Sequence, residues 1–522
     1  MSRRNSYLVG AGILLSRISG LVRQSLLARY VGLGDAADAF TAAFRIPNLL
    51  QNLFGEGALS ASFIPSYSRL IEEGREEEAR QLAGAVLALL TTTMAILVLV
   101  GELATPLLLN VLVGDWVGEK RALTERLVRI LFPGAGLLVI SAWCLGVLNS
   151  HRRFLLSYAA PVVWNAAMIV AILTVGRGES AARVTLAASV GSVIGSFLQI
   201  AVQWPVVRQV GGRIVLRSWR GVREASVVIR TFIPTMISRG ANQLSAFIDV
   251  GIAAYLPTGA MAAIGAAQTL YTLPVSLFGM AITAAELPEM SRERGDDATV
   301  AMALRIRLDA ATQRLAFYIV PSAMAFVAIG GVMAGAVYQS GRFTADDTAY
   351  VWLVLAGAAI GLLASTLGRL YSSAFYALRD ATTPLRTGLV RVSLTAVLGV
   401  LAGLVLPPLL GLPARAGAAG LTISAGMAGW VEFMLLRRAL IRRLGQFALP
   451  TVELFKLWGA AGIAGGVATG VRLGTAHLLP IAQALMVVPA FGATYIMLTS
   501  WLDIPEAAVL GGRVLARLRR RP

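Results

Sequence analysis

Long apolar runs follow one another along the whole chain, and short segments that hold most of the charges separate them. Many runs reach the roughly 20 residues that a helix needs to cross a bilayer. They are continuous rather than alternating, which favours helices over the strands of a closed barrel. The pattern therefore predicts an all-α polytopic membrane protein.

About fourteen transmembrane helices are predicted. The spans are 6–31, 36–68, 81–113, 123–149, 157–175, 184–207, 225–256, 259–289, 309–338, 347–378, 385–408, 416–437, 452–475 and 481–502.

Composition supports this class, since the 522 residues are 57% hydrophobic and only 14% charged, whereas a soluble domain carries about 25% charged residues. A net charge of +18 could suggest nucleic acid. However, the arginines gather at every second loop, which is the positive-inside pattern of membrane proteins. We therefore expect no nucleic-acid partner, cytoplasmic termini at both ends, and a first apolar helix that is retained because no small-residue cleavage site follows it.

Short motifs recur in the same order about 220 residues apart. "IPSYSR" closes the second span and "LPEMSR" the eighth, while "SRISG" and "YVGLG" are echoed by "SRGAN" and "YLPTG". Six spans separate the copies, so a parallel repeat of two six-helix lobes around a central cavity is predicted. The expected domains are an N-lobe at 1–222, a C-lobe at 223–445, and two further helices with a basic tail at 446–522.

The first span carries charges where lipid would be expected. At about 100° per residue its polar side chains fall within an arc of about 120°. That stripe consists of Ser16, Arg17, Gly20, Arg23 and Gln24. Because charges in a membrane usually face a protein interior or a wet cavity, the glycine between the two arginines suggests room for something to approach.

Two other spans repeat this arrangement. In the second span the polar side of the helix carries Asp38, Thr41, Arg45, Asn48, Asn52 and Glu56. In the seventh it carries Ser238, Arg239, Asn242 and Asp249.

Two interpretations of these charges are open. In the first they pair with one another and fix the helix register, the pairs being Arg23 with Asp38, Arg45 with Glu56, and Arg239 with Asp249. In the second they line a cavity of net positive charge, where arginine forks suit a diphosphate group. Arg29 and Arg45 could instead extend to the membrane interface, and Glu432 is expected to pair with the basic loop one turn away.

Several functions lack their motifs. No glycine-rich nucleotide loop, zinc-ligand spacing or nucleophile–base arrangement is present. We expect neither an enzyme nor a resident cofactor or metal. A secondary transporter remains, driven by a coupling monovalent cation, the membrane potential or the substrate gradient.

The same residues carry a family resemblance. "SRISGLVRQSLLARYVGLGDAADAF" and "AFRIPNLLQNLFGEGALSASFIPSYS" resemble the opening of the MurJ (MviN) family, and "YQSGRFTADD" and "FYALRDATTP" continue the likeness. The resemblance implies the fold of the multidrug/oligosaccharidyl-lipid/polysaccharide exporter superfamily. It also implies a bacterial inner-membrane flippase for lipid II, the undecaprenyl-diphosphate-linked peptidoglycan precursor, with the last two helices holding the polyprenyl tail.

The resemblance assigns cavity roles to Arg17, Arg23, Asp38 and Glu56, and a cation role to Asp249. This chain departs from the family at two places. Members carry a basic pair where it has Gln51 and Asn52, and an Asp–Arg pair in the eighth helix where it has Gln268 and Thr269. We expect Arg239, with Asn242 nearby, to replace the missing C-lobe arginine.

Three alternatives to lipid II transport follow from the same residues. The chain could export another polyprenyl-diphosphate glycan, exchange cationic drugs for ions, or serve as a non-transporting scaffold for cell-wall synthesis proteins. Excess acidic side chains in the cavity would favour the drug antiporter. The first two spans instead carry an excess of arginine. The absence of the family's Asp–Arg pair from the eighth helix leaves the scaffold alternative open.

Overall fold

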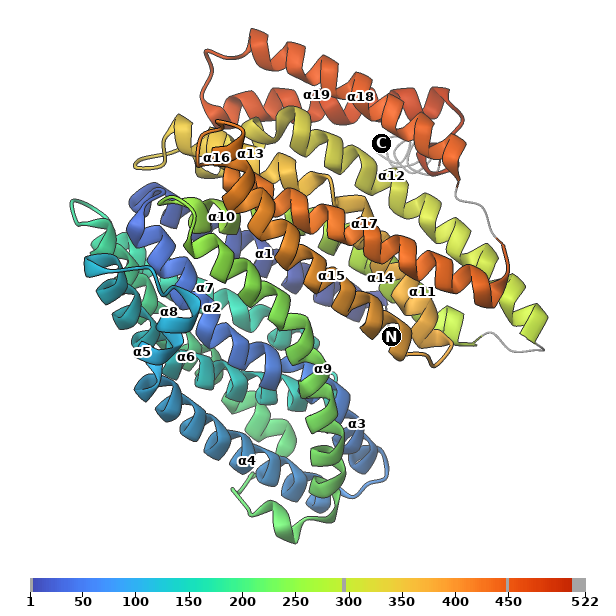
Figure 1. Ribbon diagram of the computed structural model, residues 1–522. Coiled ribbons are helices and arrows are strands. Elements are labelled where there is room, and N and C mark those ends of the chain that lie inside the picture. Colours follow the sequence, from blue (N-terminus) through green and yellow to red (C-terminus); the bar gives the residue numbers. More distant parts are fainter. Residues whose placement is uncertain (1–2, 293–296, 447–449, 509–522) are drawn as a thin grey trace, which may run out of the picture. The chain divides into compact units, whose positions relative to one another are not determined.

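The computed structural model describes residues 3–292, 297–446 and 450–508, and within them all regular structure is helical (Figure 1). The predicted all-α class is confirmed. The described chain divides into two compact units. Unit 1 comprises the chain up to Ala262 together with Ser340–Phe343, and unit 2 comprises the rest.

Unit 1 is built from nine α-helices, one 3-10 turn and the start of a tenth helix. They are α1 (Arg3–Val31), α2 (Asp35–Phe54), α3 (Glu56–Glu72), α4 (Glu76–Leu103), α5 (Thr105–Leu112), α6 (Gly118–Ser150), α7 (Phe154–Val175), α8 (Ala181–Gly211), η1 (Trp219–Gly221), α9 (Arg223–Ala254) and the first turn of α10 (Ala260–Pro274).

Unit 2 continues α10 and includes two short π-helical stretches. Its elements are η2 (Val275–Met280), α11 (Ala281–Arg292), α12 (Asp297–Tyr338), α13 (Ala345–Ala359), α14 (Leu362–Ala377), α15 (Thr382–Val400), η3 (Leu401–Val405), α16 (Leu406–Leu409), α17 (Ala416–Leu444), α18 (Thr451–Gly474) and α19 (Pro480–Trp501).

Three of the predicted spans are divided into two helices, and one of them, 81–113, divides at Ala104 between α4 and α5. The span 36–68 divides at Gly55, where a β-carbon would lie 2.2 Å from the carbonyl oxygen of Gln51. Only glycine allows this close approach of the chain to itself. The span 347–378 divides between α13 and α14, which bend by 43°.

Fewer helices meet a length-and-hydropathy test for membrane crossing than predicted. Among the described residues ten helices pass, or up to eleven if α13 and α14 form one span. The helices α1, α2 and α9 are not among them, and these are the ones that carry the polar stripes. The count of fourteen is therefore not confirmed and stays a prediction.

The predicted lobes are defined by the sequence repeat, whereas the observed units are defined by contacts within the structure. Contacts place α9 in unit 1, whereas the sequence repeat puts the lobe boundary at 222/223. In unit 2, α18 and α19 pack against each other and against α12 (Figure 1). The lobe boundaries stay a prediction about the repeat.

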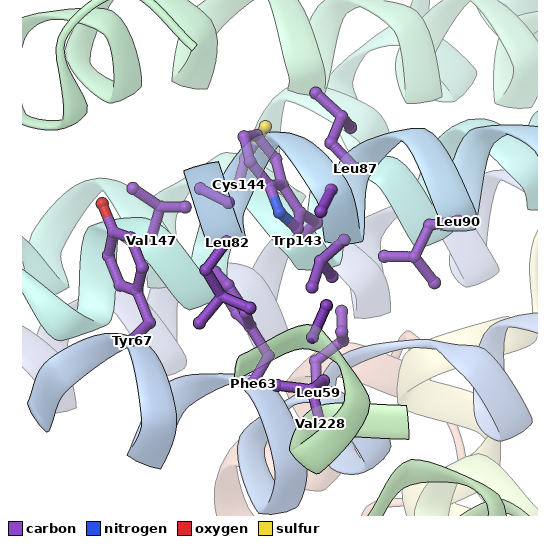
Figure 2. Close-up of a cluster of buried hydrophobic side chains, with 14 of the residues drawn as sticks. Leu59, Phe63, Tyr67, Leu82, Leu87, Leu90, Trp143, Cys144, Val147 and Val228 are labelled. Atoms are coloured by element: carbon purple, nitrogen blue, oxygen red, sulfur yellow. The ribbon is translucent and has the colours of Figure 1, made fainter. Parts of the chain in front are cut away.

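The core of unit 1 lies where α3, α4 and α6 meet. Trp143, Phe63 and Leu82 are fully buried there (Figure 2). The only cysteine of the chain, Cys144, is buried in the same cluster. This core fixes the framework on which the charged helices are held.

Replacing Trp143 by alanine should leave a large void in this core and destabilise unit 1 by about 3–5 kcal/mol. The apparent melting temperature in detergent can be followed with a thiol-reactive dye, because Cys144 becomes accessible only when the cluster opens. Trp219→Ala is the control, since that side chain is 40% exposed and should change the melting temperature little. Equal shifts for the two variants would contradict the assigned core.

Candidate functional site

The polar stripe of α1 lies against α7. The Arg23 guanidinium donates through Nη1 to Oδ1 of Asn165 at 3.0 Å, and it stacks over the Trp164 ring at 4.8 Å. Asn165 in turn donates to Oγ of Ser19 at 2.9 Å. A β-carbon at Gly20 would lie 3.9 Å from the Asn165 amide, so α7 is the neighbour that this glycine faces. The predicted Arg23–Asp38 pair is wrong.

Arg17 lies on the same helix but in different surroundings. Its side chain is exposed, and no hydrogen bond or ion pair is present for it within the described part of the chain. Arg23 is held by uncharged groups, namely the Asn165 amide, the Trp164 ring and, at 3.9 Å, the sulfur of Met168. The stripe therefore carries two positive charges that no described carboxylate neutralises.

Asp38 belongs to a buried network at the start of α2. Its side chain is 2% exposed and accepts hydrogen bonds from Lys120 Nζ at 2.9 Å, Gly259 N at 2.8 Å and Ala262 N at 3.0 Å. Gly259 directly precedes α10 and Ala262 lies in its first turn, so Asp38 caps that helix from a distant part of the sequence. Its charge is thus satisfied inside unit 1, and a role in substrate binding stays a prediction.

Lys120 joins this network to its surroundings. Its ammonium group lies 3.0 Å from Asp35 and 4.1 Å from the ring centroid of Trp116. The indole of Trp116 donates to the Ala254 carbonyl at 3.0 Å, and Thr258 donates to Asp35 at 3.0 Å. The acidic start of α2 and the basic start of α6 are thereby held together at the end of α9.

The C-terminal half of α2 faces α9. Arg45 lies close enough to Asp249 for an electrostatic interaction, and Asn52 Nδ2 donates to Gln243 Oε1 at 3.4 Å. The polar sides predicted for these two helices therefore do meet.

Three predicted site residues have side chains outside the described part of the structure, namely Glu56, Arg239 and Asn242. The pairs Arg45–Glu56 and Arg239–Asp249 stay predictions, as does the cation role of Asp249.

Unit 2 holds an intramembrane pair that the sequence analysis did not assign. Nη1 of Arg391 in α15 lies 3.2 Å from Oε2 of Glu432 in α17. The expectation that Glu432 pairs with the nearby basic loop is wrong, because its partner comes from a neighbouring span.

Sequence signals for the missed residues exist. Asn165 is a lone amide in an apolar span, Lys120 is one of two lysines in the chain, and Arg391 is a charge inside a predicted helix. None of these signals names the partner, which only helix packing decides.

Comparisons with known proteins agree on one family. The family model described as "Lipid II flippase MurJ" matches residues 27–488. The "Probable lipid II flippase MurJ" of Rhizobium tropici is 31% identical over 439 residues, which cover 83% of this chain and 80% of that protein. The "Lipid II flippase MurJ" of Burkholderia cenocepacia is 31% identical over 437 residues, which cover 82% of each chain.

Two solved structures share the fold. "Lipid II flippase MurJ, inward closed conformation" superposes with a TM-score of 0.76 at 20% identity, covering 95% of this chain and 98% of that one. An inward-facing multidrug resistance MATE family transporter of the MOP superfamily gives 0.65 at 17% identity, covering 82% and 96%. At these identities the structures support the fold alone.

The Asp38 network yields a matched pair of variants. Asp38→Ala would leave the largely buried Lys120 without its main partner and uncap α10, and breaking a buried pair costs about 3–5 kcal/mol. Asp35→Ala removes a carboxylate that bonds the same lysine but is 58% exposed, so it should cost at most about 1 kcal/mol. Thermal unfolding in detergent checks both. If Asp38→Ala melted like the wild type, the structural assignment of Asp38 would fail.

Proposed function

Since this chain belongs to the MurJ family of lipid II flippases, we propose that it moves lipid II from the inner to the outer leaflet of the bacterial cytoplasmic membrane. It is a multi-pass membrane protein with many apolar helices. We place both termini in the cytoplasm, on the arginine distribution of the loops.

One observation carries the proposal. Arg17 and Arg23 project from one helix, α1, which we place in the membrane, and no described carboxylate neutralises either of them. An uncompensated guanidinium is costly in a membrane but is suited to a diphosphate, because its planar fork donates two hydrogen bonds to neighbouring oxygens. The lipid-linked diphosphate of the precursor offers that group.

Transport would proceed by alternating access, with the polar head crossing inside the protein while the polyprenyl tail stays in lipid. Arg23 would orient the diphosphate, because Asn165 and Trp164 hold its guanidinium in place without cancelling its charge. This chain's own residues supply no covalent chemistry in this scheme, and we propose a non-enzymatic transporter.

The driving force is a monovalent cation gradient or the membrane potential. If a cation binds at Asp249, it has to displace the electrostatic contact with Arg45. This arrangement would couple cation entry to the release of one more arginine from α2.

Alternative substrates differ in the charge that they present. A drug–cation antiporter needs a negative site, and the excess of arginine on α1 opposes it. Another polyprenyl-diphosphate glycan would satisfy the same arginines, so the glycan itself has to be identified by experiment. Membrane lipids would surround the protein, and we propose cell-wall synthesis proteins as further partners.

A leaflet-accessibility assay for lipid II in cells depleted of their own flippase tests the proposal. Wild-type protein should restore lipid II in the outer leaflet, and Arg23→Ala should lower the restored amount at least about tenfold, because a charge-assisted hydrogen bond to the diphosphate contributes about 1.5–3 kcal/mol.

The matched control is Arg183→Ala. Arg183 pairs with Glu179 at 2.8 Å on the exposed start of α8, and such surface pairs contribute little. It should restore lipid II as the wild type does. Wild-type protein that is inserted in the membrane yet restores no lipid II would refute the lipid II substrate, and full activity of Arg23→Ala would refute the role of that arginine.

A further inference from the structure

Two arginines of unit 2 lie at a similar depth inside apolar helices. Arg369 is eight residues before the end of α14, and Arg391 is nine residues after the start of α15. At 1.5 Å per residue these positions are about 12 and 14 Å from the short loop that joins the two helices. Since α14 runs toward that loop and α15 runs away from it, both side chains enter the same layer of the unit.

The helices α14, α15 and α17 pack against one another around these arginines (Figure 1). Glycines make room for the one carboxylate between them, since a β-carbon at Gly368 or at Gly388 would lie 3.9 Å from an Oε atom of Glu432. Arg369, next to Gly368, is close enough to Arg391 and Glu432 to interact electrostatically with both.

The charges of this cluster do not balance. Glu432 is engaged by Arg391 at 3.2 Å, which leaves Arg369 as the second guanidinium beside a single carboxylate. Arg369 is exposed, and its side chain has no hydrogen bond or ion pair within the described residues. A net positive charge in an apolar bundle has to be met by water or by an anion.

Hydroxyl groups lie beside the unbalanced arginine. Ser365 precedes Arg369 by one helical turn and so shares its face of α14. Its Oγ lies 2.9 Å from the hydroxyl of Tyr271 in α10, which brings that phenol into the neighbourhood of Arg369. The surroundings therefore combine an available guanidinium with neutral hydrogen-bond donors.

We propose that Arg369, supported by the Arg391–Glu432 pair and by Ser365 and Tyr271, forms an oxyanion-binding site in unit 2 that takes a phosphate or carboxylate group of the transported lipid. A purely structural pair explains Arg391 and Glu432 but gives Arg369 no role. The identity of the lipid rests on the proposed function, whereas the oxyanion site itself does not.

Two groups of the lipid could occupy the site, its diphosphate or a carboxylate of its peptide. They can be told apart with three probes: lipid II, lipid II with amidated peptide carboxylates, and undecaprenyl diphosphate. Binding is measured on the full-length protein in lipid nanodiscs, for the wild type, Arg369→Gln and a control. The control is Arg438→Gln, an exposed arginine near the end of α17.

Arg369→Gln should weaken lipid II binding at least about tenfold, the usual effect of losing a charge-assisted hydrogen bond, and Arg438→Gln should stay within twofold of wild type. If the diphosphate is the occupant, binding of all three probes falls. If a carboxylate is the occupant, only unmodified lipid II loses affinity. Wild-type affinity of Arg369→Gln for every probe would overturn the site.

Thermal stability separates a binding role from a structural one. Without ligand, Arg369→Gln should melt at or above the wild-type temperature, because an unneutralised charge has been removed, and ligand should raise its melting temperature less than that of the wild type. Glu432→Gln should melt lower, because it leaves Arg391 unpaired. A clear loss of stability in ligand-free Arg369→Gln would assign Arg369 to structure and overturn the proposal.

Inorganic pyrophosphate makes the test independent of the lipid. An Arg369-dependent rise in melting temperature with pyrophosphate would support the oxyanion site even if the wild type bound no lipid II, an outcome that would contradict the proposed function alone. Failure of the wild type to respond to pyrophosphate or to any lipid probe would overturn the site.

Discussion

A charge inside an apolar helix bundle has to find a partner, and this requirement organises both units of the chain. Two described carboxylates have found theirs. Asp38 accepts from three donors, and Glu432 is paired with Arg391. The guanidinium groups of Arg17 and Arg369 are left without a described partner. The imbalance has one sign in both units, and it is the sign that an anionic substrate requires.

The positions of the helices can be predicted from the sequence, because the length of an apolar run is a local property of the chain. Each predicted span falls on helical segments, including those with internal charges. The breaks do not follow, because they depend on close approaches such as that of Gly55 to the Gln51 carbonyl. The number of membrane crossings is also hard to obtain from hydropathy, since their polar stripes make α1, α2 and α9 less apolar.

The sequence places charged residues on particular helix faces, but it does not predict which residues pair with them. Periodicity places Arg17 and Arg23 on one side of α1, but it cannot say that this side packs on α7 and meets Asn165. The sequence does not reveal the partners of Asp38, because Lys120 and the start of α10 are far away from it along the chain. Pairing is decided by which helices are neighbours, and that information is absent from any single span.

A transporter for a charged head group also has to release it. If every arginine were neutralised by a carboxylate, the protein would be stable but would bind no diphosphate. If none were restrained, the cost of inserting the helices would rise and their side chains would have no fixed geometry. The arrangement of Arg23 lies between these limits, because an amide and an aromatic ring fix its position while its charge is kept. Neutral support of this kind would allow Arg23 to bind a diphosphate in a fixed orientation but with moderate affinity, and moderate affinity at each step is what movement from one leaflet to the other requires.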